Sequence, residues 1–119
     1  CTDHTPCADR EKSGPLKEAL PGAVGLETAF AAGYTGLVLP GYLSLSRLVQ
    51  LMGSAPAELL GRSSQLKEDQ PLDLVFLDTD EELVYSKSTL RSRSSNTPFL
   101  GRALRGRVTS LYLDGVKQF

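Results

Sequence analysis

The sequence predicts an α/β protein with loops and helices in its first half and β-strands in its second half. Apolar residues recur at helical spacing in "SLSRLVQLM", whereas β-branched and aromatic residues are concentrated in "LDLVFLD" and "RVTSLYLDGVKQF". Within the last of these runs, Asp114-Gly115 is typical of a two-residue hairpin turn. The period changes after Gly61, so we predict two segments, 1–61 and 62–119.

Length and composition indicate one soluble globular domain. The chain has 119 residues, of which 40% are hydrophobic and 23% charged, and its net charge is −1. The longest apolar runs are far shorter than the roughly 18 residues of a membrane-spanning helix, and no signal-peptide pattern is recognised. We therefore expect a cytoplasmic protein without membrane association. Because the chain begins with Cys1 rather than Met, we interpret it as part of a longer protein.

The first third is expected to be mostly loop, because prolines and glycines interrupt any long period, with a helix following in "GLETAFAAGY". The next segment predicts an amphipathic helix with apolar residues at i, i+3, i+4 and i+7: Leu45, Leu48, Val49 and Met52. Ser44 is its expected N-cap and Gly53 its expected end. A second short helix is predicted, with Ser54 as its cap, Pro56 in its first turn and Gly61 as its stop.

Between the predicted strands lies "SKSTLRSRSSNTPFLGRALRG", which we predict to be irregular, since Pro98 cannot sit in a central strand. From Leu83 to Leu113 there is no acidic residue, and six basic residues fall in that span: Lys87, Arg91, Arg93, Arg102, Arg105 and Arg107. A nucleic-acid patch would produce such a run. We favour a solvated or interdomain loop and expect no nucleic acid, because the arginines lack a helical or strand period and the whole chain is slightly acidic.

The opening stretch "CTDHTPC" concentrates side chains that bind metals or transfer protons: Cys1, Asp3, His4 and Cys7. One interpretation is a self-contained zinc site, since Cys-x2-His-x2-Cys offers three ligands and Asp3 a fourth. Another is that Asp3 is one ligand of a larger catalytic metal site, where it also takes a proton from water. A third is that Asp3 caps a turn before the proline-containing loop. We expect both thiols to be reduced.

Five stretches, taken in order, carry a resemblance to a known family. "TDHTPCADREK", "PGAVGLETAF", "LSLSRLVQLMGSAPAELLG", "LDLVFLD" and "NTPFLGRALRGRV" together resemble the carboxyl-terminal part of dihydroorotase, a cyclic-amide hydrolase of the amidohydrolase superfamily. The resemblance runs over nearly all of the chain. Each stretch is weak by itself, whereas their order and spacing are highly specific.

The resemblance implies a (β/α)8 barrel beside a small β-sandwich, with the active site at the carboxyl ends of the barrel strands. Residues 1–61 would then be the last barrel segment, with Asp3 closing the eighth strand, and residues 62–119 would be strands of the sandwich. A whole barrel needs about 250 residues. The remainder of the barrel polypeptide is therefore an implied partner of this chain.

The resemblance also implies a reaction, the reversible hydrolysis of dihydroorotate to N-carbamoyl-aspartate in pyrimidine biosynthesis. Asp3 would ligate zinc, present as one or two ions, and act as general base and acid. Pro21 and Gly22 would line the substrate pocket through backbone contacts, or form an ordinary turn. Cys7 stands where the family usually has a histidine that helps to hold the substrate carboxylate. A thiol is a poor donor, so an allantoinase-like cyclic ureide hydrolase is the alternative.

The other metal ligands implied by the resemblance would lie upstream, so we expect the isolated chain to be inactive. A non-catalytic homologue with a scaffold role is a further alternative, because some members of the family support a partner aspartate transcarbamoylase without catalysing a reaction. The predicted helix from Leu45 to Met52 would expose its apolar face once separated from a barrel. We therefore expect self-association or a homo-oligomer.

Overall fold

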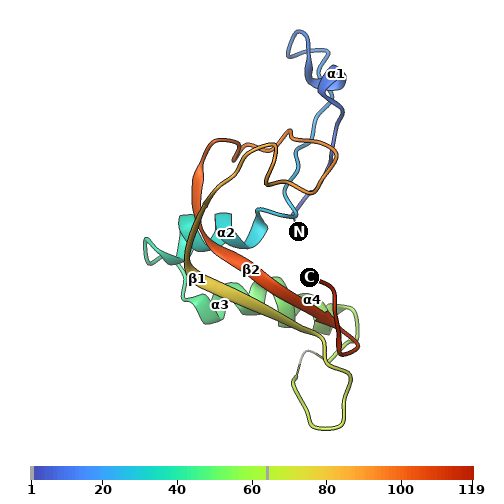
Figure 1. Ribbon diagram of the computed structural model, residues 1–119, viewed down its shortest axis with the longest axis vertical. Helices are drawn as coiled ribbons and strands as arrows, with labels where there is room; N and C mark the ends of the chain where they lie inside the picture. Colours follow the sequence, from blue (N-terminus) through green and yellow to red (C-terminus); the bar gives the residue numbers. More distant parts are fainter. Residues whose placement is uncertain (1, 64) are drawn as a thin grey trace.

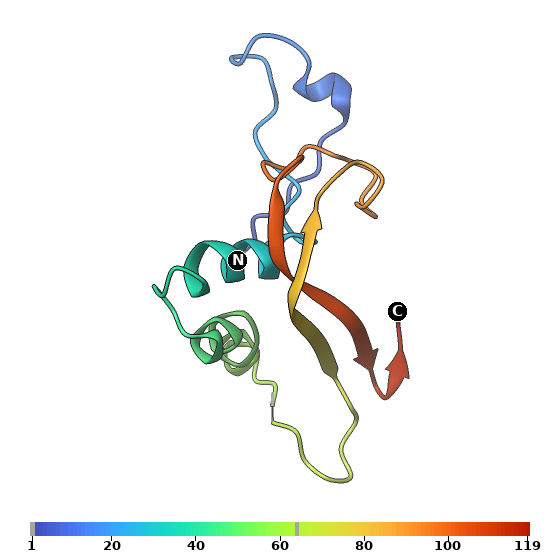
Figure 2. The ribbon, with the colours of Figure 1, turned by 60° about the vertical axis from the view of Figure 1, so that its left-hand side comes forward.

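Helices and strands are segregated along the chain and in space. The computed structural model describes residues 2–63 and 65–119. Figure 1 shows its elements, which in order are α1 (Asp9–Lys12), α2 (Ala29–Gly33), the π-helical η1 (Tyr34–Val38), α3 (Leu45–Val49), the π-helical η2 (Gln50–Ser54), α4 (Ala55–Leu59), β1 (Leu74–Val84), β2 (Ala103–Leu113) and β3 (Val116–Lys117). Figure 2 shows α2, α3 and α4 on one side of the sheet, while α1 lies beyond its end. The predicted α/β class is confirmed, whereas the barrel and the sandwich stay predictions.

The sheet is a three-stranded antiparallel meander in the order β1-β2-β3. Between β2 and β3, Asp114 and Gly115 have φ values of +50° and +76°. Two successive positive φ angles form the type I′ turn, whose twist matches that of the flanking strands. The predicted two-residue hairpin is therefore confirmed.

The two long strands extend beyond the predicted runs. β1 continues to Val84 and β2 already begins at Ala103, so the prediction of irregular chain over 103–106 was wrong. Contacts between distant residues extend the strands: Leu83 pairs with Leu104, and Leu104 is buried in the core. The chain that joins the two strands is irregular, as predicted.

Residues 45–59 form one continuous helical run made of α3, η2 and α4. Its start is confirmed, because the Ser44 hydroxyl accepts a hydrogen bond from the Arg47 N–H at 3.2 Å. The predicted break between two helices at Gly53 and Ser54 was wrong. Gly53 lies inside the run, and Ser54 has helical backbone angles and makes no capping hydrogen bond.

The π-helical turn η2 explains why the helix continues toward Pro56. The Ala55 N–H donates to the Gln50 carbonyl, five residues back. Pro56 follows directly and has no N–H of its own to donate, and a π-helical turn replaces the regular four-residue bonding pattern ahead of it. Pro56 lies in the first turn of α4, as predicted. The helix ends at Leu59, and Gly61, the predicted stop, follows two residues later with a φ of +65°.

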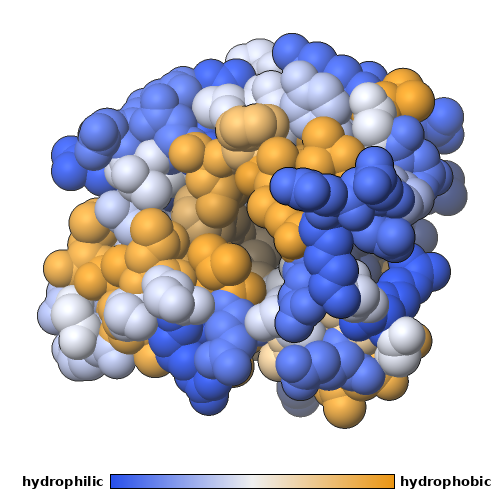
Figure 3. Space-filling model, turned by 90° about the horizontal axis from the view of Figure 1, so that it is seen from below, coloured by the Kyte–Doolittle hydropathy of each residue, from blue (hydrophilic) through white to orange (hydrophobic). Residues whose placement is uncertain are grey.

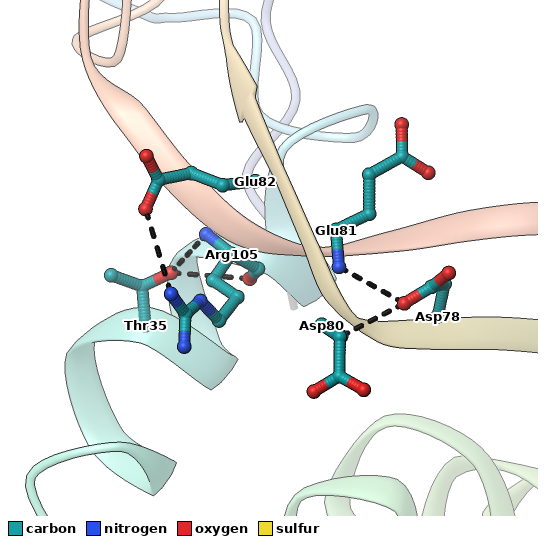
Figure 4. Close-up of polar contacts among 6 residues, drawn as sticks. All are labelled: Thr35, Asp78, Asp80, Glu81, Glu82 and Arg105. Carbon is teal, nitrogen blue, oxygen red and sulfur yellow. Dashed lines mark hydrogen bonds and ion pairs between the residues drawn. The ribbon is translucent and has the colours of Figure 1, made fainter.

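The core lies between α2, the paired strands and the loop that joins them. Its members are Ala31, Tyr85, Leu90 and Leu104, with Phe99 packed against them. Beside it, the rings of Phe30 and Tyr34 stack with 5.9 Å between centroids. Their approach to β2 requires glycine, because a side chain at Gly106 would come within 3.0 Å of Phe30. A neighbouring contact also joins η1 to β2 (Figure 4). The Thr35 hydroxyl accepts from the Arg105 N–H at 2.7 Å and donates to the Arg105 carbonyl at 3.1 Å.

The predicted apolar face of the helical run is only partly exposed. The expectation of exposure was wrong for Leu48, which is 5% exposed and packs so closely on Gly33 that an added side chain there would meet it at 3.0 Å. Leu45, Val49 and Met52 are 37%, 47% and 43% exposed, so self-association stays a prediction. Figure 3 shows apolar side chains gathered around a hollow on the face seen from below. Among the described residues, no helix combines the length and apolar character needed to cross a membrane.

Candidate functional site

The opening loop and segment 21–25 lie side by side. His4 and Ala23 form a parallel β-bridge, and the Thr5 N–H donates to the Ala23 carbonyl at 2.9 Å. Asp3 precedes the bridge by one residue. The structure therefore brings together the two segments that the sequence predicts to carry site residues.

The Asp3 carboxylate has no hydrogen-bond or ion-pair partner among residues 2–63 and 65–119. The φ of Asp3 is +46°, an angle that costs a residue with a side chain about 1 kcal/mol and that clusters at functional sites. The residue is exposed. Within the described part of the chain, its main-chain carbonyl accepts a hydrogen bond from the Thr5 hydroxyl at 3.3 Å, whereas its carboxylate accepts none. The side chain therefore does not cap the turn and is open to a ligand.

The described residues do not form a self-contained zinc site, since they hold no group of three or more His, Cys, Asp or Glu able to bind a metal. The His4 Nδ1 instead accepts hydrogen bonds from the Gly25 N–H at 3.3 Å and the Leu26 N–H at 3.2 Å. Cys1 lies outside the described residues. Asp3 fits a metal as a single oxygen ligand, which requires a site shared with further residues.

Cys7 is buried, with 6% of its surface exposed, and its thiol is free. The Sγ atom donates weakly to the Thr5 carbonyl at 3.7 Å and to the Pro21 carbonyl at 3.6 Å. The thiol thus faces backbone and connects the opening loop to Pro21. A role of Cys7 in substrate binding stays a prediction, and by these contacts it would act through Pro21.

Gly22 is required by the close packing of the two loops. Its φ is +116°, and a Cβ at this position would lie 2.6 Å from the Thr5 Cβ. Its carbonyl accepts hydrogen bonds from the Lys12 Nζ at 2.7 Å and the Asn96 Nδ2 at 3.2 Å. Pro21 and Gly22 are both exposed, and their role in lining a substrate pocket stays a prediction.

The loop between β1 and β2 supplies residues that the sequence does not single out. The Asn96 Oδ1 accepts from the Cys7 N–H at 3.4 Å. The buried Ser94 hydroxyl lies against the same Oδ1 and donates to the Cys7 carbonyl at 2.5 Å. The stretch "NTPF" contributes to the resemblance, yet no signal in it indicates a contact with a loop 89 residues away.

Glu27 is the second such residue. Its carboxylate accepts hydrogen bonds from the Arg91 N–H at 2.7 Å and the Ser92 N–H at 2.8 Å, which fix the joining loop over segment 21–25 and the residues that follow it. The Tyr85 hydroxyl donates to the Glu27 carbonyl at 3.5 Å. Burial raises the pKa of Tyr85, and the negative charge of Glu27 raises it further, so the hydroxyl stays protonated as a donor.

Known proteins match this chain over nearly all of its length. It is 41% identical over 116 residues to a dihydroorotase of Lactiplantibacillus plantarum and 40% identical over 114 residues to a dihydroorotase of Thermoanaerobacter sp.. Each match covers 96% of this chain but 27% and 26% of the relative. The chain therefore spans about a quarter of the length of these curated relatives. No protein-family model matches it.

Solved structures match the fold. L-hydantoinase from Arthrobacter aurescens aligns with a TM-score of 0.76 and 33% identity, over 86% of this chain and 23% of that one. D-hydantoinase from Bacillus sp. AR9 aligns with a TM-score of 0.83 over 98% of this chain and 27% of that one, and at 22% identity it shows likeness of fold alone. These comparisons give no support to a partnership with aspartate transcarbamoylase. They confirm the family resemblance, because this chain is a homologue of dihydroorotases over 96% of its length.

Proposed function

We propose that this chain is the carboxyl-terminal part of a zinc-dependent, dihydroorotase-like cyclic amide hydrolase. The full-length protein would hydrolyse dihydroorotate reversibly to N-carbamoyl-aspartate, a cytoplasmic step of pyrimidine biosynthesis. Residues 1–61 would complete a barrel and residues 62–119 would belong to a sandwich. The observation that carries the proposal is the exposed carboxylate of Asp3, unpaired among the described residues, beside segment 21–25 in a chain that matches dihydroorotases over 96% of its length.

Asp3 would carry out the proton transfer. Zinc, when bound, supplies Lewis-acid activation of the ring carbonyl and of water, and Asp3 would be one of its ligands. A carboxylate oxygen of Asp3 takes the proton from the attacking water and then delivers it to the leaving amide nitrogen. Asp3 suits this role because its exposed carboxylate has no competing donor among the described residues.

Pro21 and Gly22 would hold the substrate ring through their backbone. Both are exposed, and Gly22 has no side chain to keep a ring away from the chain. Cys7 would hold the Pro21-Gly22 backbone in place, because its thiol donates a weak hydrogen bond to the Pro21 carbonyl. The expected substrate is thus a small cyclic amide.

A cyclic ureide hydrolase is the second candidate. The 33% identity with an L-hydantoinase favours it. Cys7 also favours it, because a buried thiol directed at the Thr5 and Pro21 carbonyls offers no strong donor to a substrate carboxylate. An allantoinase-like enzyme of this kind would keep the same role for Asp3.

The test uses the full-length protein with its zinc content measured. Dihydroorotate, N-carbamoyl-aspartate, allantoin and hydantoin are offered under the same conditions, and sedimentation of the same sample tests the expected homo-oligomer. A zinc-containing protein that prefers dihydroorotate supports the first candidate, whereas a preference for allantoin or hydantoin supports the second. A zinc-free protein that opens none of these rings would overturn both and favour a non-catalytic scaffold.

A further inference from the structure

Asn96 joins the two loops that carry the proposed site. Its Oδ1 accepts from the Cys7 N–H at 3.4 Å, and its Nδ2 donates to the Gly22 carbonyl at 3.2 Å. Its main-chain carbonyl accepts from the Val24 N–H at 3.1 Å. One residue of the joining loop thus contacts the opening loop once and segment 21–25 twice.

The orientation of the Asn96 amide is set by its partners. The Cys7 N–H is a donor and the Gly22 carbonyl an acceptor, so a flipped amide would place donor against donor and acceptor against acceptor. Both ends of the amide are therefore in use. An aspartate at this position would keep an acceptor for Cys7 but would set a second oxygen against the Gly22 carbonyl.

Gly22 needs such a support because a glycine backbone rotates easily. The Lys12 Nζ also bonds the Gly22 carbonyl, at 2.7 Å, but a lysine side chain has far more rotamer freedom than the short side chain of Asn96. Asn96 is itself restrained through its main chain, because its carbonyl accepts from the Val24 N–H at 3.1 Å. It is thus the more rigid of the two supports.

We propose that Asn96 is a positioning residue that fixes the Gly22 carbonyl relative to the opening loop and thereby sets the shape of the substrate pocket. The inference rests on the proposed function, in which Pro21 and Gly22 hold the substrate ring. Asn96 acts through Gly22 and does not itself touch the substrate. Its loss should therefore weaken substrate binding more than the chemical step.

The test compares Asn96→Asp and Asn96→Ala with wild type in the full-length protein. Since a lost bond leaves the Gly22 carbonyl facing a carboxylate, Asn96→Asp should raise KM for the hydrolysed ring by about tenfold with a smaller change in kcat. Hydrogen exchange of residues 20–25 should become faster in both variants. Ser95→Ala is the matched control, because Ser95 lies in the same loop and no hydrogen bond of its hydroxyl is found within the described part of the chain.

The outcomes separate positioning from stability. Higher KM with faster exchange over residues 20–25, and neither change in Ser95→Ala, supports the proposal. Unchanged exchange, or a lower kcat with unchanged KM and a lower melting temperature, overturns it. If wild type opens none of the rings, the proposed function fails by itself, and the exchange of residues 20–25 alone decides whether Asn96 holds this segment.

Discussion

Two regions of this molecule are held together in different ways. In the loop region, residues 2–28 with 86–102, side chains such as Glu27 and Asn96 bind backbone groups of distant segments. In the helix–sheet region, aromatic rings of α2 and η1 pack on β2 at Gly106. The hydrogen bonds of the loop region lose stabilising free energy when one partner is left unpaired. The ring packing of the helix–sheet region loses it when side-chain volume is added or removed.

The proposed site lies in the loop region, and the helix–sheet region supports it structurally. Val24 and Thr28 of the loop region are completely buried; the Val24 N–H donates to the Asn96 carbonyl at 3.1 Å and the Thr28 hydroxyl donates to the Gly25 carbonyl at 3.2 Å. Substitutions in the loop region should therefore alter loop order and substrate binding first. Substitutions in the helix–sheet region should lower the stability of the whole fold.

The largest loss of stability is expected for Gly106→Ala in the helix–sheet region. The new methyl group would meet the Phe30 ring at 3.0 Å and the Tyr34 ring at 3.2 Å, at a backbone φ of +95°. Overpacking and backbone strain together should lower the free energy of unfolding by about 2–4 kcal/mol. Chemical denaturation of the intact protein, followed by circular dichroism, measures the change.

Gly115→Ala is the matched control for this substitution. Gly115 also has a positive φ, +76°, but open space surrounds it. Its replacement should therefore cost the backbone strain alone, about 1 kcal/mol. Equal losses in the two variants would contradict the claim that ring packing on β2 requires Gly106.

The next largest effect is expected for Glu27→Gln in the loop region. Glutamine keeps one acceptor oxygen but turns an NH2 group toward one of the N–H groups of Arg91 and Ser92. Losing one charge-assisted bond should cost about 1.5–3 kcal/mol, and hydrogen exchange should accelerate in the 86–102 loop more than in the sheet. Glu18→Gln, at an exposed carboxylate, is the comparison. Identical exchange in the two variants would mean that Glu27 does not hold this loop.

The sequence predicted the features whose contacts close within a few residues. The Ser44 cap and the Asp114-Gly115 turn are of this kind. The far ends of β1 and β2 were missed, because "TDEELV" and "ALRG" mix charged and small residues and become strands through pairing with each other. Glu27 and Asn96 were missed for the same reason, since their side-chain partners lie 64 to 89 residues away.

The smallest effect is expected at Asp78, where β1 departs from regular pairing. Its Oδ1 accepts from the Glu81 N–H at 3.0 Å and the Asp80 N–H at 2.8 Å (Figure 4), and these bonds lower the pKa of Asp78 below its ordinary 3.8. Because the folded-state pKa is depressed, the stabilisation is fully present above pH 3.8 and is lost as the pH falls through the folded-state pKa. The stability difference between wild type and Asp78→Asn should therefore shrink in acid. A difference that is the same at neutral pH and at about pH 3 would contradict this.

The role of Asp3 is tested most directly by Asp3→Asn in the full-length protein. Asparagine tolerates the positive φ of +46°, so the backbone should not change, and the zinc content of the same sample separates loss of the metal from loss of proton transfer. If Asp3 transfers the proton, kcat for the hydrolysed ring should fall by about 10²–10⁴-fold, while Asp9→Asn, at an exposed carboxylate nearby in the chain, keeps its activity. An Asp3→Asn enzyme with the kcat of wild type would contradict the assignment of Asp3 as general base and acid.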